Sequence, residues 1–471
     1  MTDQDEPPVA ENDPAPTPFA APGPGRVTAY RGVSLIDGTG APVRHGMAVV
    51  TDGPVIEAVV PDADLGPSGP PGAETVDARG RFLLPGLVDA HQHLSTPPNR
   101  AQAEAMMRRQ VYGGVTAIRE MAGDLRQMAD LARAALVGEI PGPDVHCAAL
   151  MAGPGFFDDP RTHQVTQGAA PGAVPWMRAV DEGTDLRLAV AAARGTGAVA
   201  IKIYADLDAS LVRRIAAEAH HQGMLVWAHA AVFPAMPGEV VAAGVDVVSH
   251  VHMLVHELSG DRPVSYRRQR EHLADAYRRF LDAPEDALDP LFEDMRRRGT
   301  VLDATASLVA RMPSSAPGAA ELAPRVLRRL IGRARRAGVT ICAGTDYETS
   351  PRDRFPSLHD ELRYLVRSMG MAPHEAIRAA TAAGAAAIGL QDTVGTVEPG
   401  KRADFVIVDA DPYEDIDHLR RIVTTVKRGR RHDRADYDRA DYHRADYDRS
   451  DHDAQAAGTG AGTGKGAPDG R

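Results

Sequence analysis

Two histidines, His91 and His93, lie two positions apart near the end of an apolar run, LLPGLVDAHQHL at residues 83–94. Residues i and i+2 of a β-strand point to the same side of the sheet. Neutral imidazole nitrogen is a favoured ligand of zinc and of other divalent ions. The pair therefore indicates a clamp for a divalent metal ion, although most His-x-His pairs considered alone are surface or core histidines.

Four further polar residues end later apolar runs. His229 ends LVWAH, His250 ends VDVVSH and Asp346 ends VTICAGTD, while Lys202 lies near the end of AVAIKIY. A buried, unpaired lysine tends to lose its proton, and its neutral amine reacts with carbon dioxide to give a carbamate that can bridge two metal ions. Each residue also has a structural explanation: a lysine that reaches solvent or an acid, a hydrogen-bonded core histidine, or a helix-capping aspartate.

The set is more specific than its members, because five apolar runs end in possible metal ligands. We expect the set to meet at one face and to hold two divalent ions. The expected ligands of the first ion are His91, His93 and Asp346, those of the second are His229 and His250, and carbamylated Lys202 lies between them.

These residues need strands whose carboxyl ends converge. Short β-like runs alternate with helix-like stretches through the middle of the chain, which favours a parallel sheet with right-handed crossovers. The pattern predicts an α/β fold, a (β/α)8 TIM barrel, rather than a doubly wound sheet, since no Gly-rich dinucleotide turn is present. The predicted strands are 86–93, 114–119, 144–150, 198–204, 224–229, 246–250, 300–304 and 339–346.

The flanking segments differ from the barrel. Short strand-like runs in both flanks predict one small flanking β-sandwich built from N- and C-terminal segments, and two long interruptions, 151–183 and 256–298, are candidate lid or specificity loops. From residue 432 onward a five-residue repeat begins with RADYD. The expected organisation is a disordered tail at 1–26, sandwich at 27–84 and 396–431, barrel at 85–395, and a disordered repeat tail at 432–471.

Composition excludes several classes of function. Lys and Arg number 53 against 64 Asp and Glu, a net charge of −11, unlike the basic footprint of a nucleic-acid binder. No apolar stretch is long enough for a membrane span, and the acidic, Pro-rich N-terminus is unlike a signal peptide. The two cysteines, Cys147 and Cys342, are expected to be buried thiols. We expect a cytoplasmic enzyme with a small-molecule substrate, and a homo-oligomer is left open.

The motifs resemble those of the amidohydrolase superfamily, in its imidazolonepropionase-related, prolidase-like branch. The resemblance covers residues 30–430 in order and rests on PGLVDAHQHL, IKIY, VWAHA, VVSHVH, AGTDY and TAAGAAAIGLQDTVGTVEPGKRADFVIVD. It implies a distorted (β/α)8 barrel with two divalent metal ions, usually zinc. The ligands it implies are His91, His93, carbamylated Lys202, His229, His250 and Asp346.

One departure bears on the reaction. Imidazolonepropionase and the deaminases of this family are mononuclear, lack the bridging lysine and carry an acid shortly after the third-strand histidine. Here His229 is followed by Ala-Ala-Val-Phe233, which argues against a deaminase.

The expected activity is hydrolysis of a C–N bond, in an amide, dipeptide-like or cyclic amide substrate, by a metal-bridging hydroxide. Asp346 would move a proton to the departing nitrogen, and Tyr204 would either donate a hydrogen bond to the substrate or pack beneath a loop. His252 is expected at best to lie beside the ligands without binding a metal ion itself. Arg119 is expected either to bind a substrate carboxylate or to pair with Glu120 or Asp124. The alternatives are hydrolysis of a carbamate, lactone or ester, a deaminase, and an inert scaffold.

Overall fold

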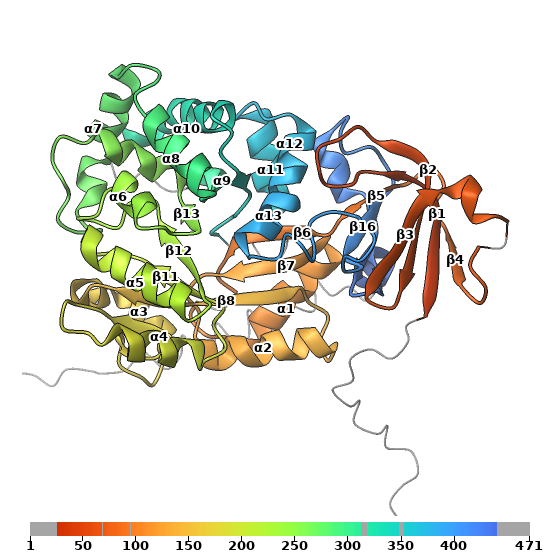
Figure 1. The fold of residues 1–471 in the computed structure, drawn as a ribbon, viewed down its shortest axis with the longest axis horizontal. Helices are drawn as coiled ribbons and strands as arrows, with labels where there is room; N and C mark the ends of the chain where they lie inside the picture. Colours follow the sequence, from red (N-terminus) through yellow and green to blue (C-terminus); the bar gives the residue numbers. More distant parts are fainter. Residues whose placement is uncertain (1–25, 68, 95, 312–317, 348–352, 440–471) are drawn as a thin grey trace, which may run out of the picture.

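The structure is a computed structural model that describes residues 26–439 except 68, 95, 312–317 and 348–352. Figure 1 shows a barrel surrounded by helices and, beside it, a separate sheet in which the red N-terminal strands lie next to blue C-terminal ones. Of the expected tails, 1–26 and 432–471, residues 1–25 and 440–471 lie outside the described residues.

The described residues contain a barrel of eight parallel strands. From β6 to β15 each strand pairs with the next, and the ring is closed by the bonds from Ala90 N to Ala343 O and from Asp346 N to His91 O, both 2.9 Å. The prediction of a (β/α)8 barrel is confirmed. The strands are β6 (Leu87–Gln92), β7 (Val115–Glu120), β8 (Asp144–Ala152), β11 (Ala200–Ile203), β12 (Leu225–His229), β13 (Val247–Ser249), β14 (Val301–Asp303) and β15 (Ile341–Cys342).

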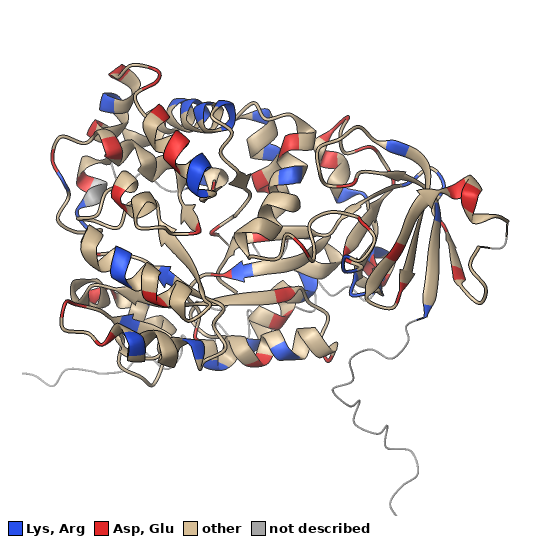
Figure 2. Ribbon diagram, viewed as in Figure 1, with Lys and Arg blue, Asp and Glu red and all other residues tan. Residues whose placement is uncertain are grey.

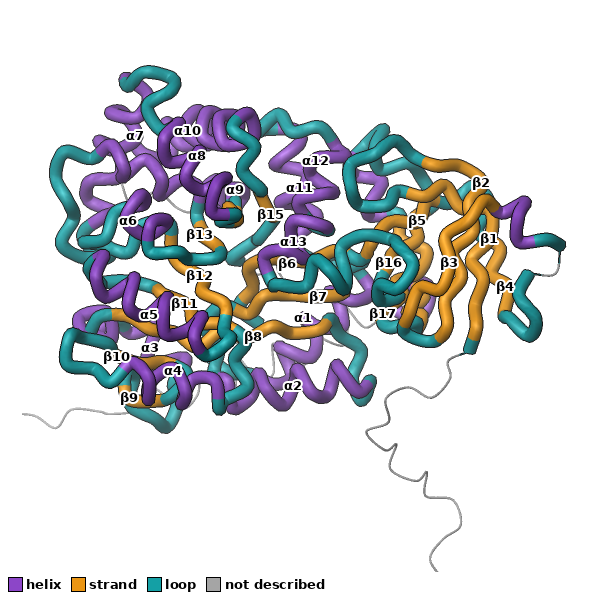
Figure 3. The backbone as a smooth tube through the Cα atoms, in the orientation of Figure 1, coloured by secondary structure: helices purple, strands orange, loops and turns teal. Residues whose placement is uncertain are grey.

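Helices cover the outside of the barrel (Figure 3). Several begin at an aspartate whose carboxylate accepts a backbone N–H, as at Asp124, Asp185 and Asp208. The helices are α1 (Arg100–Tyr112), α2 (Leu125–Val137), α4 (Leu186–Arg194), α5 (Ala209–His221), α6 (Pro237–Ala242), α8 (Asp289–Arg298), α9 (Ala306–Arg311), α10 (Ala319–Arg336), α11 (Leu358–Arg367), α12 (Pro373–Ala379) and α13 (Ala382–Ala387).

The two long interruptions of the barrel have structure of their own. The first follows β8 and carries η2 (Pro154–Asp158), α3 (Pro160–Val165), β9 (Ala173–Val174) and β10 (Met177–Ala179). The second follows β13 and carries η3 (Val251–Leu258) and α7 (Gln269–Asp282) before α8. Both leave the carboxyl end of a barrel strand, which is the edge where active sites of this fold lie.

The second sheet joins the two ends of the described chain. Its strand order is β18-β17-β16-β5-β1-β2-β3, with β4 paired to β1. Antiparallel pairing of β5 with β16 places Leu84 opposite Val406, and Tyr30 packs edge-on against Phe405. The bounds are β1 (Val27–Leu35), β2 (Arg44–Asp52), β3 (Val55–Pro61), η1 (Asp62–Leu65), β4 (Glu74–Asp77), β5 (Phe82–Pro85), β16 (Phe405–Val408), η4 (Ile416–Arg420), β17 (Ile422–Lys427) and β18 (Arg430–Asp433).

A buried charge cluster joins this sheet to the barrel. Asp144, the first residue of β8, lies 2.8 Å from Lys427 Nζ, 2.7 Å from Arg428 Nη2 and 3.1 Å from Arg402 Nη1. Although burial raises the pKa of the Asp144 carboxyl, the charges of Lys427 and Arg402 hold that pKa well below its usual range. Asp144 therefore pairs with cations contributed by the second sheet and its flanking segments, and Arg402 pairs with the buried Asp404 as well, at 2.6 Å.

The expectation of disorder from residue 432 is wrong for residues 432–439. Strand β18 continues to Asp433, and the first RADYD unit forms helix α14 (Arg434–Arg439). The Arg434 guanidinium lies 4.5 Å from the ring centre of Phe355 and donates to the carbonyls of Tyr112 and Arg354. Tyr437 is 1% exposed and packs against the Tyr112 ring. These contacts compensate for the chain entropy that the composition alone cannot offset.

Acidic and basic residues are interspersed along the helices in Figure 2, as expected for a solvent-facing layer. Among the described residues, no helix has the length and apolarity needed to cross a membrane.

The substitution Asp144→Asn is expected to lower the free energy of unfolding by about 3–5 kcal/mol, because it leaves the buried Lys427 without its paired carboxylate. Glu139→Gln, which breaks an exposed pair with Arg133, is the matched control and is expected to cost less than about 1 kcal/mol. Urea unfolding of both variants measures the difference, and equal losses would contradict a special role for the buried cluster.

The substitution Tyr437→Ala is expected to release helix α14, because the ring's contacts with Tyr112 and Arg434 are lost. Tryptic cleavage after Arg434 should become at least about tenfold faster, which corresponds to about 1.4 kcal/mol of lost docking energy. Tyr447→Ala, in the third repeat unit (RADYD at 444–448), is the control and should leave that cleavage rate unchanged. Equal acceleration in both variants would mean that α14 does not depend on its own tyrosine.

Candidate metal centre

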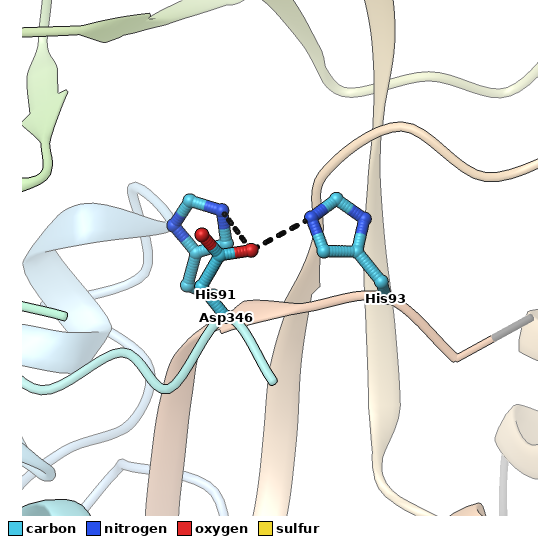
Figure 4. A group of neighbouring side chains, drawn as sticks. All are labelled: His91, His93 and Asp346. Atoms are coloured by element: carbon cyan, nitrogen blue, oxygen red, sulfur yellow. Dashed lines mark ion pairs between the residues drawn. The ribbon is translucent and has the colours of Figure 1, made fainter. Parts of the chain in front are cut away.

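Three of the expected ligands form a compact group at the carboxyl end of the barrel (Figure 4). Asp346 Oδ1 lies 3.4 Å from His91 Nε2 and 3.0 Å from His93 Nε2. One ligand atom from each of the three residues lies within 4.8 Å of the others, a spacing that suits a metal ion. Asp346 has a φ of +56°, which an ordinary residue adopts only under constraint and which recurs at functional sites.

His229 and His250 lie beside this group. The ring centre of His250 is 5.0 Å from that of His91 and 4.7 Å from that of His229. His250 Nδ1 is 3.7 Å from Asp346 Oδ2, and His250 also has a positive φ, +73°. The structure therefore brings together all four histidines and the aspartate that the sequence indicated.

Lys202 is the sixth member. It lies on β11, is fully buried, and its Nζ has no hydrogen-bond partner among the described residues. Burial, helped by the charge of Arg119, lowers the pKa of Lys202 to about 7. The charge of its ammonium form in turn acts to lower the pKa values of the nearby histidines His91, His93, His229 and His250. The amine therefore lies within electrostatic reach of the ligand cluster and is partly neutral at pH 7.

The cluster favours the protonation states that a metal ion needs. Burial lowers the pKa values of His91, His229 and His250, so these imidazoles are neutral. His93 differs, because its hydrogen bond with Asp346 raises its pKa against the effect of burial. Burial raises the pKa of Asp346, but the hydrogen bond with His93 acts in the opposite direction and helps to keep the carboxyl ionised.

Tyr204 follows Lys202 at the same edge of the barrel. Its ring centre is 4.0 Å from that of His229, 4.5 Å from Phe156 and 5.5 Å from Tyr266. Burial raises the pKa of Tyr204, so the phenol keeps its proton. Phe156 and Tyr266 come from the two long interruptions, so both candidate specificity loops reach Tyr204, whose ring packs against His229.

The sequence expectation for Arg119 is wrong. Its side chain is 0% exposed and pairs with Asp303 at 2.7 Å, not with Glu120 or Asp124. Asp303 Oδ2 also lies 2.7 Å from His91 Nδ1. Sequence reasoning missed Asp303, although an acid ending the apolar run TVLD is the same signal that identified Asp346.

Two other residues lie at the edge of the cluster. His252 is 8% exposed and its ring centre is 6.1 Å from that of His250, which places it outside the group of ligands. Glu120 accepts the backbone N–H of Leu94 at 2.7 Å, and its Oε1 lies 4.0 Å from His93 Nδ1. Glu120 therefore fixes the chain just after the two histidines.

Comparison with known proteins agrees with this geometry. The model of the amidohydrolase family matches residues 82–431. The imidazolonepropionase of Micrococcus luteus is 27% identical over 423 residues, covering 82% of this chain and 92% of that protein. The ochratoxinase of Aspergillus niger is also 27% identical, over 453 residues and 85% of each chain.

Solved structures share the fold. A Xaa-Pro dipeptidase with bound methionine aligns with a TM-score of 0.67 at 23% identity, over 86% of this chain and all of that one. The A. niger ochratoxinase structure aligns with a TM-score of 0.67 at 22% identity, over 87% and 96% of the two chains.

Taken with these matches, the barrel, the flanking sheet and the ligand cluster define a hydrolase. The chain belongs to the amidohydrolase family.

In metal-free protein, Lys202 should make stability rise with pH. Its pKa is about 7 in the folded state against 10.5 for an ordinary lysine, so between these values the unfolded chain binds the extra proton. Relative to Lys202→Met, the free energy of unfolding of the wild type should rise by up to about 1.4 kcal/mol per pH unit from pH 7 to 9. Urea titrations in carbonate-free, chelator-treated buffer provide the measurement. Lys401→Met is the control and should keep the wild-type slope; equal slopes in all three proteins would contradict the lowered pKa.

Proposed function

We propose that this chain is a binuclear, metal-dependent amidohydrolase that cleaves a C–N bond in a small amide, dipeptide-like or cyclic amide substrate. The observation that carries the proposal is the buried Lys202 amine, without a hydrogen-bond partner among the described residues, beside a cluster of largely neutral histidines. A buried amine without a partner is costly, and reaction with carbon dioxide converts it into an anionic ligand.

The donor set fits two divalent ions. His91, His93 and Asp346 would hold one ion, His229 and His250 the other, and the carbamate on Lys202 would lie between them. Imidazole nitrogen and carboxylate oxygen suit zinc, although the same donors accept other first-row ions. Ions held there supply a water of lowered pKa and an electrophile for the substrate carbonyl.

Asp346 is the proposed proton carrier. Its ionised carboxylate accepts a proton at Oδ2 from the attacking water and delivers it to the departing nitrogen. The proximity of Oδ2 to His250 and of Oδ1 to His91 and His93 holds the carboxylate in one orientation. A fixed carboxylate serves both transfers without rearranging the loop that carries it.

Tyr204 is the proposed contact to the substrate. Its phenol remains protonated, so it donates a hydrogen bond to a carbonyl or carboxylate oxygen. Phe156 and Tyr266 shield its ring, and both belong to the interruptions that would select the substrate.

Two observations favour a hydrolase of this kind over a deaminase. Lys202 lies at the cluster, and residues 230–233 after His229 are buried and apolar, so that they offer no acid to a mononuclear centre. The relatives named imidazolonepropionase, ochratoxinase and Xaa-Pro dipeptidase support a C–N substrate. Carbamates, lactones and esters are the alternative substrates.

We expect the purified chain to hold about two divalent ions and Lys202→Ala to lose most of the metal and at least about 100-fold in activity. Short carboxylic acids should restore part of both, because they replace the carbamate. Metal analysis beside hydrolysis of N-acyl amino acids and dipeptides provides the measurement, with Lys401→Ala as control. A wild type that binds no metal despite supplementation would support the inert scaffold, and a Lys202→Ala variant that keeps both ions would remove the bridging ligand.

A further inference from the structure

A buried ion pair lies inside the barrel next to the ligand cluster. Arg119, near the end of β7, and Asp303, the last residue of β14, are both 0% exposed, and Arg119 Nη2 lies 2.7 Å from Asp303 Oδ2. Two charges removed from water contribute little net stability, because the cost of desolvation offsets their attraction. The position of the pair therefore calls for a role other than stability.

The guanidinium is held by several strands. Its Nε donates to the carbonyl of Ala90 on β6, and its Nη2 lies 3.3 Å from Ser249 Oγ on β13. Its Cζ atom lies over the Trp227 ring of β12, 4.9 Å from the ring centre. These contacts fix the direction in which Arg119 presents its N–H groups, so Asp303 meets a rigid partner.

Asp303 passes this orientation to a metal ligand. Its Oδ2 accepts both from Arg119 and, at 2.7 Å, from His91 Nδ1. Because a carboxylate paired with Arg119 is an acceptor, His91 Nδ1 carries the ring hydrogen. The Nε2 lone pair of His91 then faces Asp346 Oδ1, 3.4 Å away, which is the side where an ion would bind.

The other cluster histidines have different partners. His93 Nδ1 lies 4.0 Å from Glu120, and His250 Nδ1 contacts the hydroxyl of Thr305 at 3.0 Å. The Nδ1 atom of His229 has no hydrogen-bond partner among the described residues. Of these four rings, His91 is the one held by a carboxylate that is itself paired with a buried guanidinium.

The chain leaves space for this contact at Gly344. A Cβ atom at that position would lie 2.3 Å from Asp303 Oδ1 and 2.7 Å from His91 Cβ. Both distances are too short for real atoms, so any larger residue would push the carboxylate away from the imidazole. A glycine two residues before Asp346 is therefore a requirement of the Asp303–His91 contact.

We propose that Arg119 and Asp303 are positioning residues that lock His91 in the tautomer with hydrogen on Nδ1 and thereby set the metal affinity of the site. The proposal rests on the proposed function, because it assigns His91 Nε2 to an ion. It predicts a property of the metal-free protein as well: a single tautomer at His91, fixed before any ion binds.

The experiment uses the full chain with Zn²⁺ as the probe. In metal-free wild type, ¹⁵N shifts of the imidazole rings should show His91 with hydrogen on Nδ1, the signal being assigned with His91→Gln. Asp303→Asn should bind Zn²⁺ about 10–100-fold more weakly in competition with a chelator, with a mixture of tautomers at His91. Asp144→Asn is the matched control. It also removes the charge of a buried, ion-paired aspartate, but one at the first residue of β8, whereas Asp303 is the last residue of β14.

Each outcome decides the proposal. Weaker Zn²⁺ binding in Asp303→Asn, with wild-type affinity in Asp144→Asn, supports it. Equal affinities in wild type and Asp303→Asn, or equal losses in both variants, overturn it and leave Arg119 and Asp303 a structural role. If Asp303→Asn does not fold, the wild-type spectrum decides, because hydrogen on Nε2 of His91 contradicts the proposal. A wild type that binds no Zn²⁺ refutes the proposed function, whereas the tautomer of its metal-free His91 still tests the inference.

Discussion

The site depends on the seam where the first and last strands of the barrel meet. Between β6 and β15 a few bonds replace a regular ladder, among them Asp346 N to His91 O at 2.9 Å. The buried carboxylate of Asp89 reinforces the seam by accepting from Gln92 at 2.6 Å and from the hydroxyl of Thr345 at 3.0 Å. Closure of the ring brings Asp346 to the two histidines, so closing the barrel and assembling the cluster are one event.

Burial then sets the chemistry of the assembled groups. Removing His229 and Lys202 from water favours their uncharged forms, whereas the hydrogen bond with His93 helps to keep Asp346 ionised. Such a cluster is costly as a piece of the core, since polar groups replace packed apolar side chains. Extensive apolar burial in the surrounding barrel offsets this cost in folding free energy. The same packing holds the polar groups in the positions that ligand binding requires.

The strands of the barrel were predictable because each one buried on both faces reads as an apolar run, and polar residues at the ends of such runs stand out. His229, His250 and Asp346 were found in this way. The ion-pair partner of Arg119 was not predicted. The sequence does not show whether a nearby acid such as Glu120 or a distant one such as Asp303 contacts it in the fold. The contacts of Arg434 were missed for a different reason: the repeat that contains it has the composition of a disordered tail.

By itself the sequence determined which side chains end the apolar strands, and hence the chemical types available at one edge of a parallel barrel. Only the tertiary structure decided which of them meet, how far apart they lie and which partners hold them, as in the contact of Asp303 with His91 across 212 positions. The physical reason is one of range. Periodicity and propensity are local properties of a chain, whereas a tautomer, a lowered pKa or a buried ion pair is fixed by neighbours that only folding brings within a few ångströms.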